Sequence, residues 1–581
     1  MQAEHVLIES TFNRPNRMKE IFKSVAKRAD SKMRKLGRRK PRRTDSKRLL
    51  MENNNNDRHD GFNGCDNPMT QNNFNTHVEQ RLPTVEEIKY EELAELLQVS
   101  PDVSEDGSCS MSSVHLIQRS VSQHFPEPPT DLDQNLQQHL FKVQEAVCNE
   151  LVRLGPLFET MGLMDCLFDC YHRHTFHHLN DLLQKVHSSQ NCLVLMKWVL
   201  QTYPSAELLG HPDLQRTDPI KKVDSLLNQE WLQKARDKLL DNVEKEVRAL
   251  LEKILQIEKK NQEDFDCEEA FVGFYVDTIQ CIEAVPKEAQ KISRKLSLDV
   301  RAVCFRELLT FLERYSTEQA EILGKKAKLD KPEMIPFFKT LTACSKIKLH
   351  VQTTAKDVKG CHIEEIMETL DNMEDLTLTL LKQIVTDMAK RNLERYFKTE
   401  NKHFFVFIVL IETYFSKDFC QDVKKRVMNE VYKLISHIYL KHLVRRSHSK
   451  LTKRWSPDVG QAVTEDAELL HNTISNLAPG VQQWNLMLLK IKELLDCQSI
   501  VAVQLTVASM QKECPTWRED QDLLPTLLRW KGLSGRRVKE VMNILPGQQP
   551  RSRPVSCFSW IFCWVSREST ITSREEDTSD C

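Results

Sequence analysis

The sequence predicts an all-α fold, an elongated rod of stacked helical bundles, and three observations support this prediction. Apolar residues recur at steps of three and four from Leu132 to about Leu545, the spacing of helices with one buried face. Hydrophobic residues make up 40% of the chain and charged residues 28%, a balance typical of amphipathic helices. Only 15 glycines and 22 prolines occur among 581 residues, which is sparse for folds built on tight turns. Sheet-rich and Rossmann-like folds are therefore disfavoured.

The chain starts with a strongly basic segment, residues 1–50. Between Arg14 and Arg48 there are 16 lysines and arginines and three acids, and apolar residues from Met18 to Leu36 recur at helical spacing. We expect this basic amphipathic segment to lie on anionic phospholipid, which attracts each cation by about 1 kcal/mol while the apolar face enters the headgroup boundary. The candidate lipid-binding residues are Arg14, Arg17, Lys19, Lys23, Lys27, Arg28, Lys32, Arg34, Lys35, Arg38, Arg39, Lys40, Arg42 and Arg43.

The same charges have two other interpretations. The run from Arg38 to Arg43 is typical of a nuclear address or an RNA-binding arm, but such an arm gains nothing from the apolar stripe before it. A plain solvated tail is the remaining alternative. We therefore predict a membrane partner and expect no nucleic acid.

The rest of the chain divides by composition. Residues 51–130 are rich in Asn, Ser, Asp and Pro and are predicted to be a mostly disordered linker, with a short helix near 84–98 behind the capping box of Thr84 and Glu87. Three helical regions and a tail follow. They are N-terminal bundles at 131–330 with a long seam helix near 222–260, a middle bundle at 331–470, a C-terminal bundle at 471–545, and a disordered tail at 546–581 with a short aromatic patch.

The seam helix is the longest predicted element. Val243, Val247, Leu250 and Ile254 alternate steps of three and four, as in a coiled coil or a long bundle helix. A second long stretch, from Ile363 to Met388, repeats this pattern. Helices of this length favour rods over globules.

Several segments together resemble the family of exocyst complex component 3, which includes the exocyst complex component 3-like proteins and tumour necrosis factor alpha-induced protein 2. The matching text runs from Trp198 to Ser205, from Leu208 to Asp213, through Cys304 to Tyr315, and near the end through Cys514 to Arg518 and Leu527 to Gly532. The resemblance covers about residues 84 to 545. It implies rods of stacked helical bundles, as in multisubunit tethering complexes, that act in exocytosis by binding exocyst subunits, SNARE proteins and membrane.

The sequence favours no catalytic, cofactor or metal site. Cys166, Cys170, His172, His174, His177 and His178 offer zinc-type ligands, but neighbours on one helix face lie about 6 Å apart, so one ion takes two of them and not three. Phosphate loops of the form G-x-x-x-x-G-K, G-x-S-x-G elbows and H-E-x-x-H sequences are missing. We therefore predict a protein that is not an enzyme and needs no cofactor.

A second basic patch has no acid between its first and last members. It consists of Lys441, Arg445, Arg446, Lys450, Lys453 and Arg454. These cations are predicted to face either phosphoinositide or an acidic partner such as a Ral-type small GTPase. The alternative is a solvated helix end, favoured by the helix dipole.

Two apolar segments limit the mode of membrane contact. The longest uninterrupted apolar run, Phe404 to Ile411, has eight residues, well short of the ~20 that cross a bilayer. The aromatic patch from Cys557 to Val565 is also too short to span a membrane and is either an interfacial anchor or a segment that docks into a groove. Any membrane contact is therefore expected to be peripheral.

The function predicted from these features is non-catalytic tethering in exocytosis and vesicle docking, through SNARE proteins, tether subunits and membrane. The alternative is a small-GTPase effector or scaffold that remodels the plasma membrane and cortex outside the exocyst. Seventeen cysteines without regular spacing or a signal-peptide pattern indicate reduced thiols. We expect a cytoplasmic protein, peripheral at the plasma membrane or secretory vesicles.

Overall fold

The computed structural model describes residues 111–543, apart from 206–207, 212–213, 215–224, 262–267, 357, 359–361, 399–403, 418–419, 456–457 and 515–521. All regular secondary structure within these ranges is helical, and no β-strand occurs in them, so the all-α prediction is confirmed. The predictions for the basic segment, for the helix near 84–98 and for the tail lie outside the described residues.

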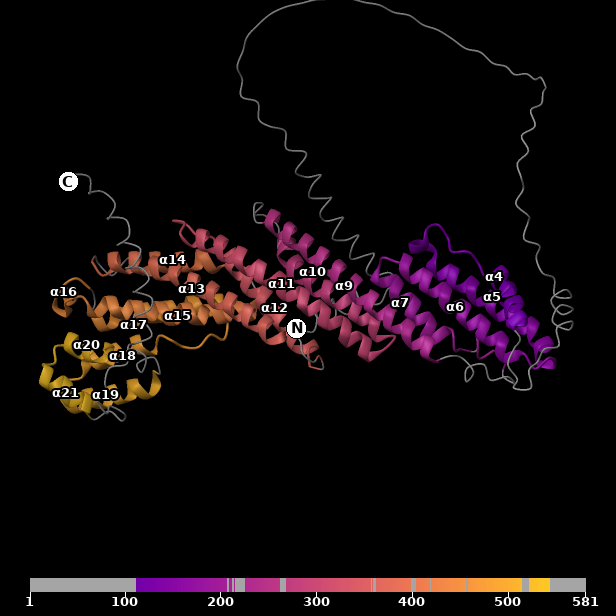
Figure 1. Ribbon diagram of the computed structural model, residues 1–581. Coiled ribbons are helices and arrows are strands. Elements are labelled where there is room, and N and C mark those ends of the chain that lie inside the picture. The colour runs from indigo at the N-terminus through magenta and orange to yellow at the C-terminus, as the bar shows by residue number, and fades with distance from the viewer. Residues whose placement is uncertain are drawn as a thin grey trace, which may run out of the picture. The chain divides into compact units, whose positions relative to one another are not determined.

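The described residues divide into two compact units, and Figure 1 labels their helices. The first unit takes the described residues up to Ser316 together with Lys346–Leu370, and the second takes Thr317–Ser345 together with the described residues from Asp371. The elements of the first unit alone are α4 (Met111–His124), α5 (Leu132–Thr160), α6 (Met164–Lys185), α7 (Ser189–Lys197), the π-helical turn η1 (Trp198–Thr202), α9 (Ser225–Asn261) and α10 (Glu268–Gln290).

Three long helices contribute residues to both units. They are α11 (Arg294–Ala327), α12 (Ile335–Thr354) and α13 (Ile363–Tyr396). The second unit continues with α14 (Phe404–Phe415), α15 (Gln421–Val444), α16 (His448–Thr452), α17 (Val459–Leu477), α18 (Leu486–Asp496), α19 (Ile500–Glu513), α20 (Leu523–Lys531) and α21 (Gly535–Asn543). The boundaries of the units fall inside helices, and our finer division at 131–330, 331–470 and 471–545 stays a prediction.

Short polar side chains define where several helices begin. Asp458 accepts a hydrogen bond from the backbone N–H of Gln461 at 2.8 Å and so caps α17. Ser499 caps α19 in the same way, with 3.1 Å to the N–H of Ala502. At the other end of a helix, Gly532 follows α20 with φ +108°, a left-handed conformation that glycine adopts without a steric penalty.

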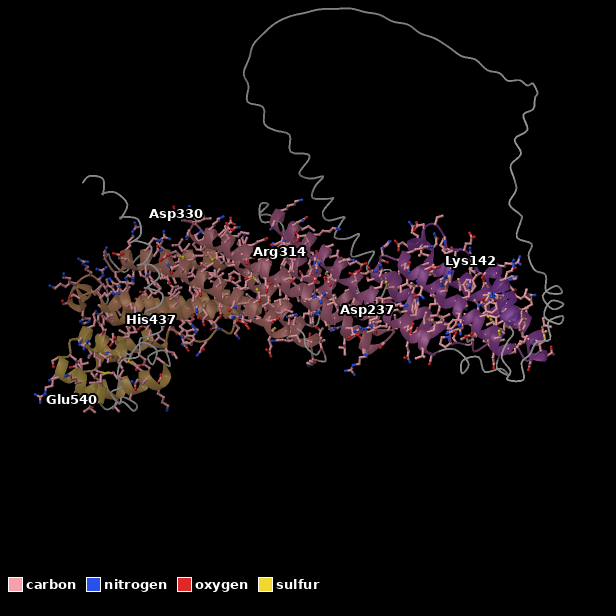
Figure 2. The ribbon with its side chains drawn as sticks, in the orientation of Figure 1. Lys142, Asp237, Arg314, Asp330, His437 and Glu540 are labelled. Carbon is pink, nitrogen blue, oxygen red and sulfur yellow. The ribbon has the colours of Figure 1, made fainter. Side chains whose placement is uncertain are left out.

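Helix α9 occupies the place of the predicted seam. Its buried stripe includes Val243, Val247 and Leu250, each at most 1% exposed, while Asp237 points to solvent (Figure 2). The helix packs against α6, α7 and α10. It is therefore a bundle helix whose stripe faces several neighbours within the first unit.

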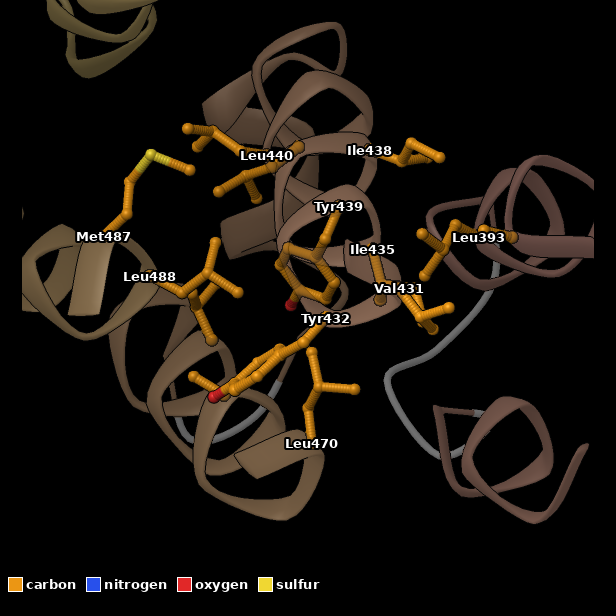
Figure 3. Packing of buried hydrophobic residues seen from close by; sticks show 14 of the residues in the cluster. Leu393, Val431, Tyr432, Ile435, Ile438, Tyr439, Leu440, Leu470, Met487 and Leu488 are labelled. Atoms are coloured by element: carbon orange, nitrogen blue, oxygen red, sulfur yellow. The ribbon is translucent and has the colours of Figure 1, made fainter. Parts of the chain in front are cut away.

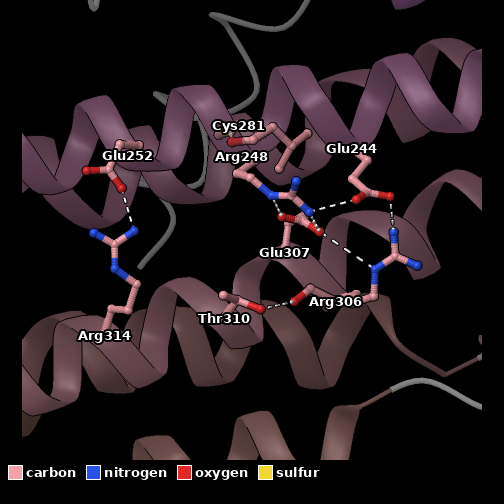
Figure 4. A network of polar contacts seen from close by, with 9 residues as sticks. Glu244, Arg248, Glu252, Cys281, Arg306, Glu307, Thr310 and Arg314 are labelled. Carbon is pink, nitrogen blue, oxygen red and sulfur yellow. Dashed lines mark hydrogen bonds and ion pairs between the residues drawn. The ribbon is translucent and has the colours of Figure 1, made fainter.

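Ion pairs fix the register between α9 and α11 (Figure 4). Arg248 Nε donates to the buried carboxylate of Glu307 at 2.9 Å, and its guanidinium also reaches Glu244 at 2.6 Å. Glu244 bonds to Arg306, and Glu252 bonds to Arg314 further along the same two helices. Because each helix supplies both charges, a shift by one turn breaks several pairs at once.

The linker prediction is wrong for residues 111–124, where the structure has helix α4. Ile117 and Val121 lie four positions apart and are each 1% exposed, and α4 packs against α6. The prediction used the average composition of residues 51–130, and the serines and glutamines around this short apolar stripe make that average polar. Packing of this buried face against α6 contributes more to the stability of the helix than its intrinsic propensity does.

A pair of histidines is buried between α5 and α6. The Nε2 atoms of His139 and His178 lie 2.8 Å apart, so one ring donates a hydrogen bond and the other accepts it. Burial, with the charges of His139 and His174, lowers the pKa of His178 to about 4. The pair is therefore neutral at pH 7, and protonating both rings leaves two donors facing each other.

The first unit is expected to lose stability as the pH falls from 6.5 to about 4. The pKa of His178 in the folded chain lies below its ordinary value, so protons bind preferentially to the unfolded chain in this range. We expect a loss of about 2 kcal/mol between pH 7 and about pH 4.5. Thermal unfolding of the wild type and of His178→Gln at these two pH values measures this loss of stability. The control is His177→Gln, which changes an exposed histidine of the same helix. An unchanged pH dependence in His178→Gln would contradict the assignment.

The core of the second unit surrounds α15, which packs against α17, α18 and α20. Tyr432 and Tyr439 of α15 lie close to Leu470 of α17 and Leu488 of α18 (Figure 3). Each of these four side chains is at most 1% exposed. Removal of this much apolar surface from water is the main stabilising contribution to the unit.

Candidate functional site

The second basic patch lies where α15 ends and α16 begins. Lys441 belongs to the last turn of α15, Arg445 is the residue at its C-terminal end, and Lys450 is in α16. Helix carbonyls that have no intrahelical partner make such an end slightly negative, so cations there are locally favourable. The two helix ends account for part of the clustering of these cations.

Most of the patch is open to solvent. Its exposed members are Arg445, Lys450, Lys453 and Arg454, and the half-buried ones are Lys441 and Arg446. Arg445, Lys450 and Lys453 form no ion pair with any residue in the described ranges. Three cations without a counter-charge in the described part of the chain make this surface a candidate binding site for an anion.

The structure adds cations that the sequence alone does not place here. Arg454 Nη1 donates to the backbone carbonyl of Lys398 at 3.1 Å, which brings the end of α13 beside the patch. Lys390, two turns earlier in α13, is close enough to contribute to the lowered pKa of His442. These lysines precede the patch by more than 40 residues, so no local pattern links them to it.

The titration of neighbouring groups reflects the local positive charge. Burial lowers the pKa of His442, and Arg445 and Arg446 lower it further. Glu394 lies 2.6 Å from Lys398, and this hydrogen bond holds the pKa of the carboxyl below its ordinary value. The histidine is therefore neutral and Glu394 ionised at pH 7, and the patch keeps a net positive charge.

Helix α20 closes one side of the patch and serves a structural purpose. Trp530 Nε1 donates to the backbone carbonyl of Arg446 at 2.7 Å. Lys531 Nζ donates to the carbonyls of Leu495 and Cys497, each at 2.9 Å, and so satisfies the C-terminal end of α18. Lys531 is therefore occupied and is not a member of the candidate anion-binding site.

The cysteine and histidine stretch of α6 is used for packing. Cys170 is buried, and Nδ1 of the buried His172 lies 3.0 Å from the hydroxyl of Tyr203. His178 is held by His139, whereas His177 faces outward near Asp181. In the described ranges, no three His, Cys, Asp or Glu side chains lie together in a way that holds a metal ion.

No helix within the described ranges has the length and apolar character needed to span a bilayer. The eight-residue run of α14 splits between two environments. Phe404, Phe407, Ile408 and Ile411 are buried in the second unit, while Phe405, Val406 and Val409 are exposed.

Known proteins are similar to this chain in sequence. Residues 114–529 match the family described as exocyst complex component Sec6. Exocyst complex component 3 of Drosophila melanogaster is 29% identical over 89 residues, 15% of this chain and 12% of that protein. An exocyst complex component 3-like protein of Danio rerio is 23% identical over 282 residues, 42% of this chain and 36% of that protein. The chain thus matches well under half the length of these relatives.

A solved structure extends the likeness to the fold. The crystal structure of M-Sec superposes with a TM-score of 0.58 at 16% identity, covering 81% of this chain and 84% of that chain. The family match spans the helices of both units, from α4 to α20. The chain belongs to the Sec6 family of exocyst complex components.

Proposed function

We propose that this protein is a non-catalytic tether in exocytosis, one that assembles with exocyst subunits and SNARE proteins at membranes. The observation that carries the proposal is the Sec6 family match over residues 114–529, which contains nearly all of the described helices. Long helices joined by ion pairs, as between α9 and α11, suit a spacer that transmits position rather than a reaction centre. The protein acts in the cytoplasm and meets the plasma membrane or secretory vesicles peripherally.

Helix α19 offers a surface for packing against another tether subunit. Val501 and Leu505 lie one turn apart and are 59% and 69% exposed. Adjacent apolar residues on a helix suit packing against an amphipathic helix of a partner.

Co-purification tests the tethering proposal. Tagged full-length protein is expected to recover several exocyst subunits from cells, whatever nucleotide is present. The pair Val501→Lys and Leu505→Lys should reduce that recovery at least about tenfold, since charges cannot enter an apolar interface. Leu349→Lys, at a 58% exposed position of α12, is the matched control. Recovery of no exocyst subunit by the wild type would refute the proposal.

The second candidate function is a small-GTPase effector or scaffold outside the exocyst. Arg445, Lys450 and Lys453, which form no ion pair with a described residue, favour it, because an acidic protein surface complements these cations. The same co-purification separates the two functions. Nucleotide-dependent recovery of a Ral-type GTPase, without exocyst subunits, would support the effector.

We also propose that the basic segment, residues 1–50, binds anionic lipid. The full chain with Arg38, Arg39, Arg42 and Arg43 changed to Gln should bind phosphatidylserine vesicles at least about tenfold more weakly, and salt should weaken wild-type binding. Sedimentation with vesicles measures both effects. The control is a variant that loses four cations of α9 instead. In it, Gln replaces Lys234, Lys245, Lys259 and Lys260. Equal binding by the two variants would end the proposal.

A further inference from the structure

The first turns of α14 present an apolar surface to solvent. Phe405 is 62% exposed, Val406 53% and Val409 39%. The opposite side of the helix fills the core through Phe404 and Phe407, so the exposed side chains are not needed to hold the helix in place. Contiguous exposed apolar residues are uncommon on soluble proteins and mark interaction surfaces.

This apolar surface lies at the same end of the second unit as part of the second basic patch. The ring of Phe404 lies 5.5 Å from that of Tyr396 at the end of α13 and 5.6 Å from that of Tyr439 in α15. Arg454 bonds to the carbonyl of Lys398, two residues beyond Tyr396. Phe405, the next residue after Phe404, therefore lies at the same end of the second unit as these two cations.

The apolar character is confined to that end of α14. Further along the helix the exposed positions are polar, with Glu412 and Thr413. A surface that meets a bilayer edge-on requires apolar residues where it enters and polar residues where it emerges.

We propose that this end of the second unit docks on an anionic membrane. Phe405, Val406 and Val409 enter the headgroup boundary, and cations around them contact lipid phosphates. The contributing cations are Lys398, Arg445, Lys450, Lys453 and Arg454. The proposal goes beyond the tethering role, because it requires no exocyst subunit.

A membrane fits this surface better than an acidic protein does. The exposed cations come from the turn after α13, the end of α15, α16 and the residues after α16, and Arg445, Lys450 and Lys453 lack a counter-charge among the described residues. A protein would have to offer separate carboxylates for each cation and a pocket for Phe405. A bilayer supplies phosphates and apolar depth along one plane, without a defined register.

Photo-crosslinking at position 405 tests the contact directly. In the full chain, p-benzoylphenylalanine replaces Phe405. The substituted protein is mixed with vesicles of phosphatidylcholine and phosphatidylserine and then irradiated. Crosslinking to lipid is expected with these vesicles and not with phosphatidylcholine alone. The matched control carries the same group at Phe141, an exposed phenylalanine of α5 with 55% exposure. Absence of a lipid adduct at 405, or equal adducts at 405 and 141, overturns the proposal.

Binding by substituted chains gives a second, independent readout. To reduce the contribution of the basic segment, all variants carry Gln at Arg38, Arg39, Arg42 and Arg43. Phe405→Ser should weaken vesicle binding about tenfold, and Lys450→Gln with Lys453→Gln about 20-fold, while Phe141→Ser should have no effect. Unchanged vesicle binding combined with loss of a co-purified protein would identify a protein interface and overturn the lipid assignment. Loss of vesicle binding with exocyst recovery intact would support both proposals separately.

Discussion

Replacing Arg301 by methionine is expected to destabilise the first unit by about 3–5 kcal/mol. Arg301 lies in α11 and is 8% exposed. Its Nη2 donates to Glu283 of α10 at 3.1 Å, and its Nη1 donates to the carbonyl of Thr354 in α12 at 3.0 Å. The substitution removes the arginine donor from a buried carboxylate and from a carbonyl, and it leaves the carboxylate only His350 at 3.4 Å and Lys287 at 4.0 Å.

The protonation of Glu283 supports this expectation. Burial acts to raise the pKa of its carboxyl, but His350 and Arg301 together hold it below the ordinary value, so the group is ionised at pH 7. His350 Nε2 lies 3.4 Å from the carboxylate and cannot by itself replace the guanidinium. Arg301→Met combined with Glu283→Gln should therefore recover part of the lost stability.

Urea unfolding, with hydrogen exchange of α10 amides to locate the change, measures the effect. The matched control is Arg314→Met in the same helix. Arg314 is 51% exposed and pairs with Glu252, so its loss should cost at most about 1 kcal/mol. Similar losses in the two variants would show that burial does not determine the importance of these arginines.

Replacing Asp466 by asparagine is expected to stabilise the second unit by about 2–4 kcal/mol at pH 8. Burial raises the pKa of Asp466 to about 7, although hydrogen bonds from Tyr396 and Tyr439, at 2.5 and 2.6 Å, oppose the rise. The folded-state pKa lies above the ordinary 3.8, so stability is highest below that value and declines as the pH rises through 7. Asparagine is neutral throughout and keeps an oxygen that accepts from both tyrosines.

Thermal unfolding at pH 5 and pH 8 measures this effect. The wild type should be less stable at pH 8, whereas Asp466→Asn should show a much smaller difference between the two conditions. Asp458→Asn, which changes an exposed N-cap of the same helix to another good N-cap, is the control and should be nearly neutral. A wild type that is more stable at pH 8 than at pH 5, by an amount that Asp466→Asn does not change, would contradict the assignment.

The basic patch shows how far local sequence defines a site. Its six members lie within one stretch of chain, so their clustering is visible as a run without acids. The contribution of Lys398 and the adjoining position of Phe405 depend on the way the ends of α13, α14 and α15 meet. A charge run indicates that cations are close, but it does not indicate which apolar side chains lie beside them.

By itself the sequence determined the helical class, the place of the longest helix and the six cations of the basic patch. The spacing of apolar residues and the local charge depend only on residues that are close together in the chain. The tertiary structure alone decided which helices face one another. It placed His139 against His178, Arg301 against Glu283, and Tyr396 and Tyr439 against Asp466, and it decided which side of α14 stays exposed. These partners are separated by 18 to 70 positions, and periodicity records only that a face is buried, not what buries it.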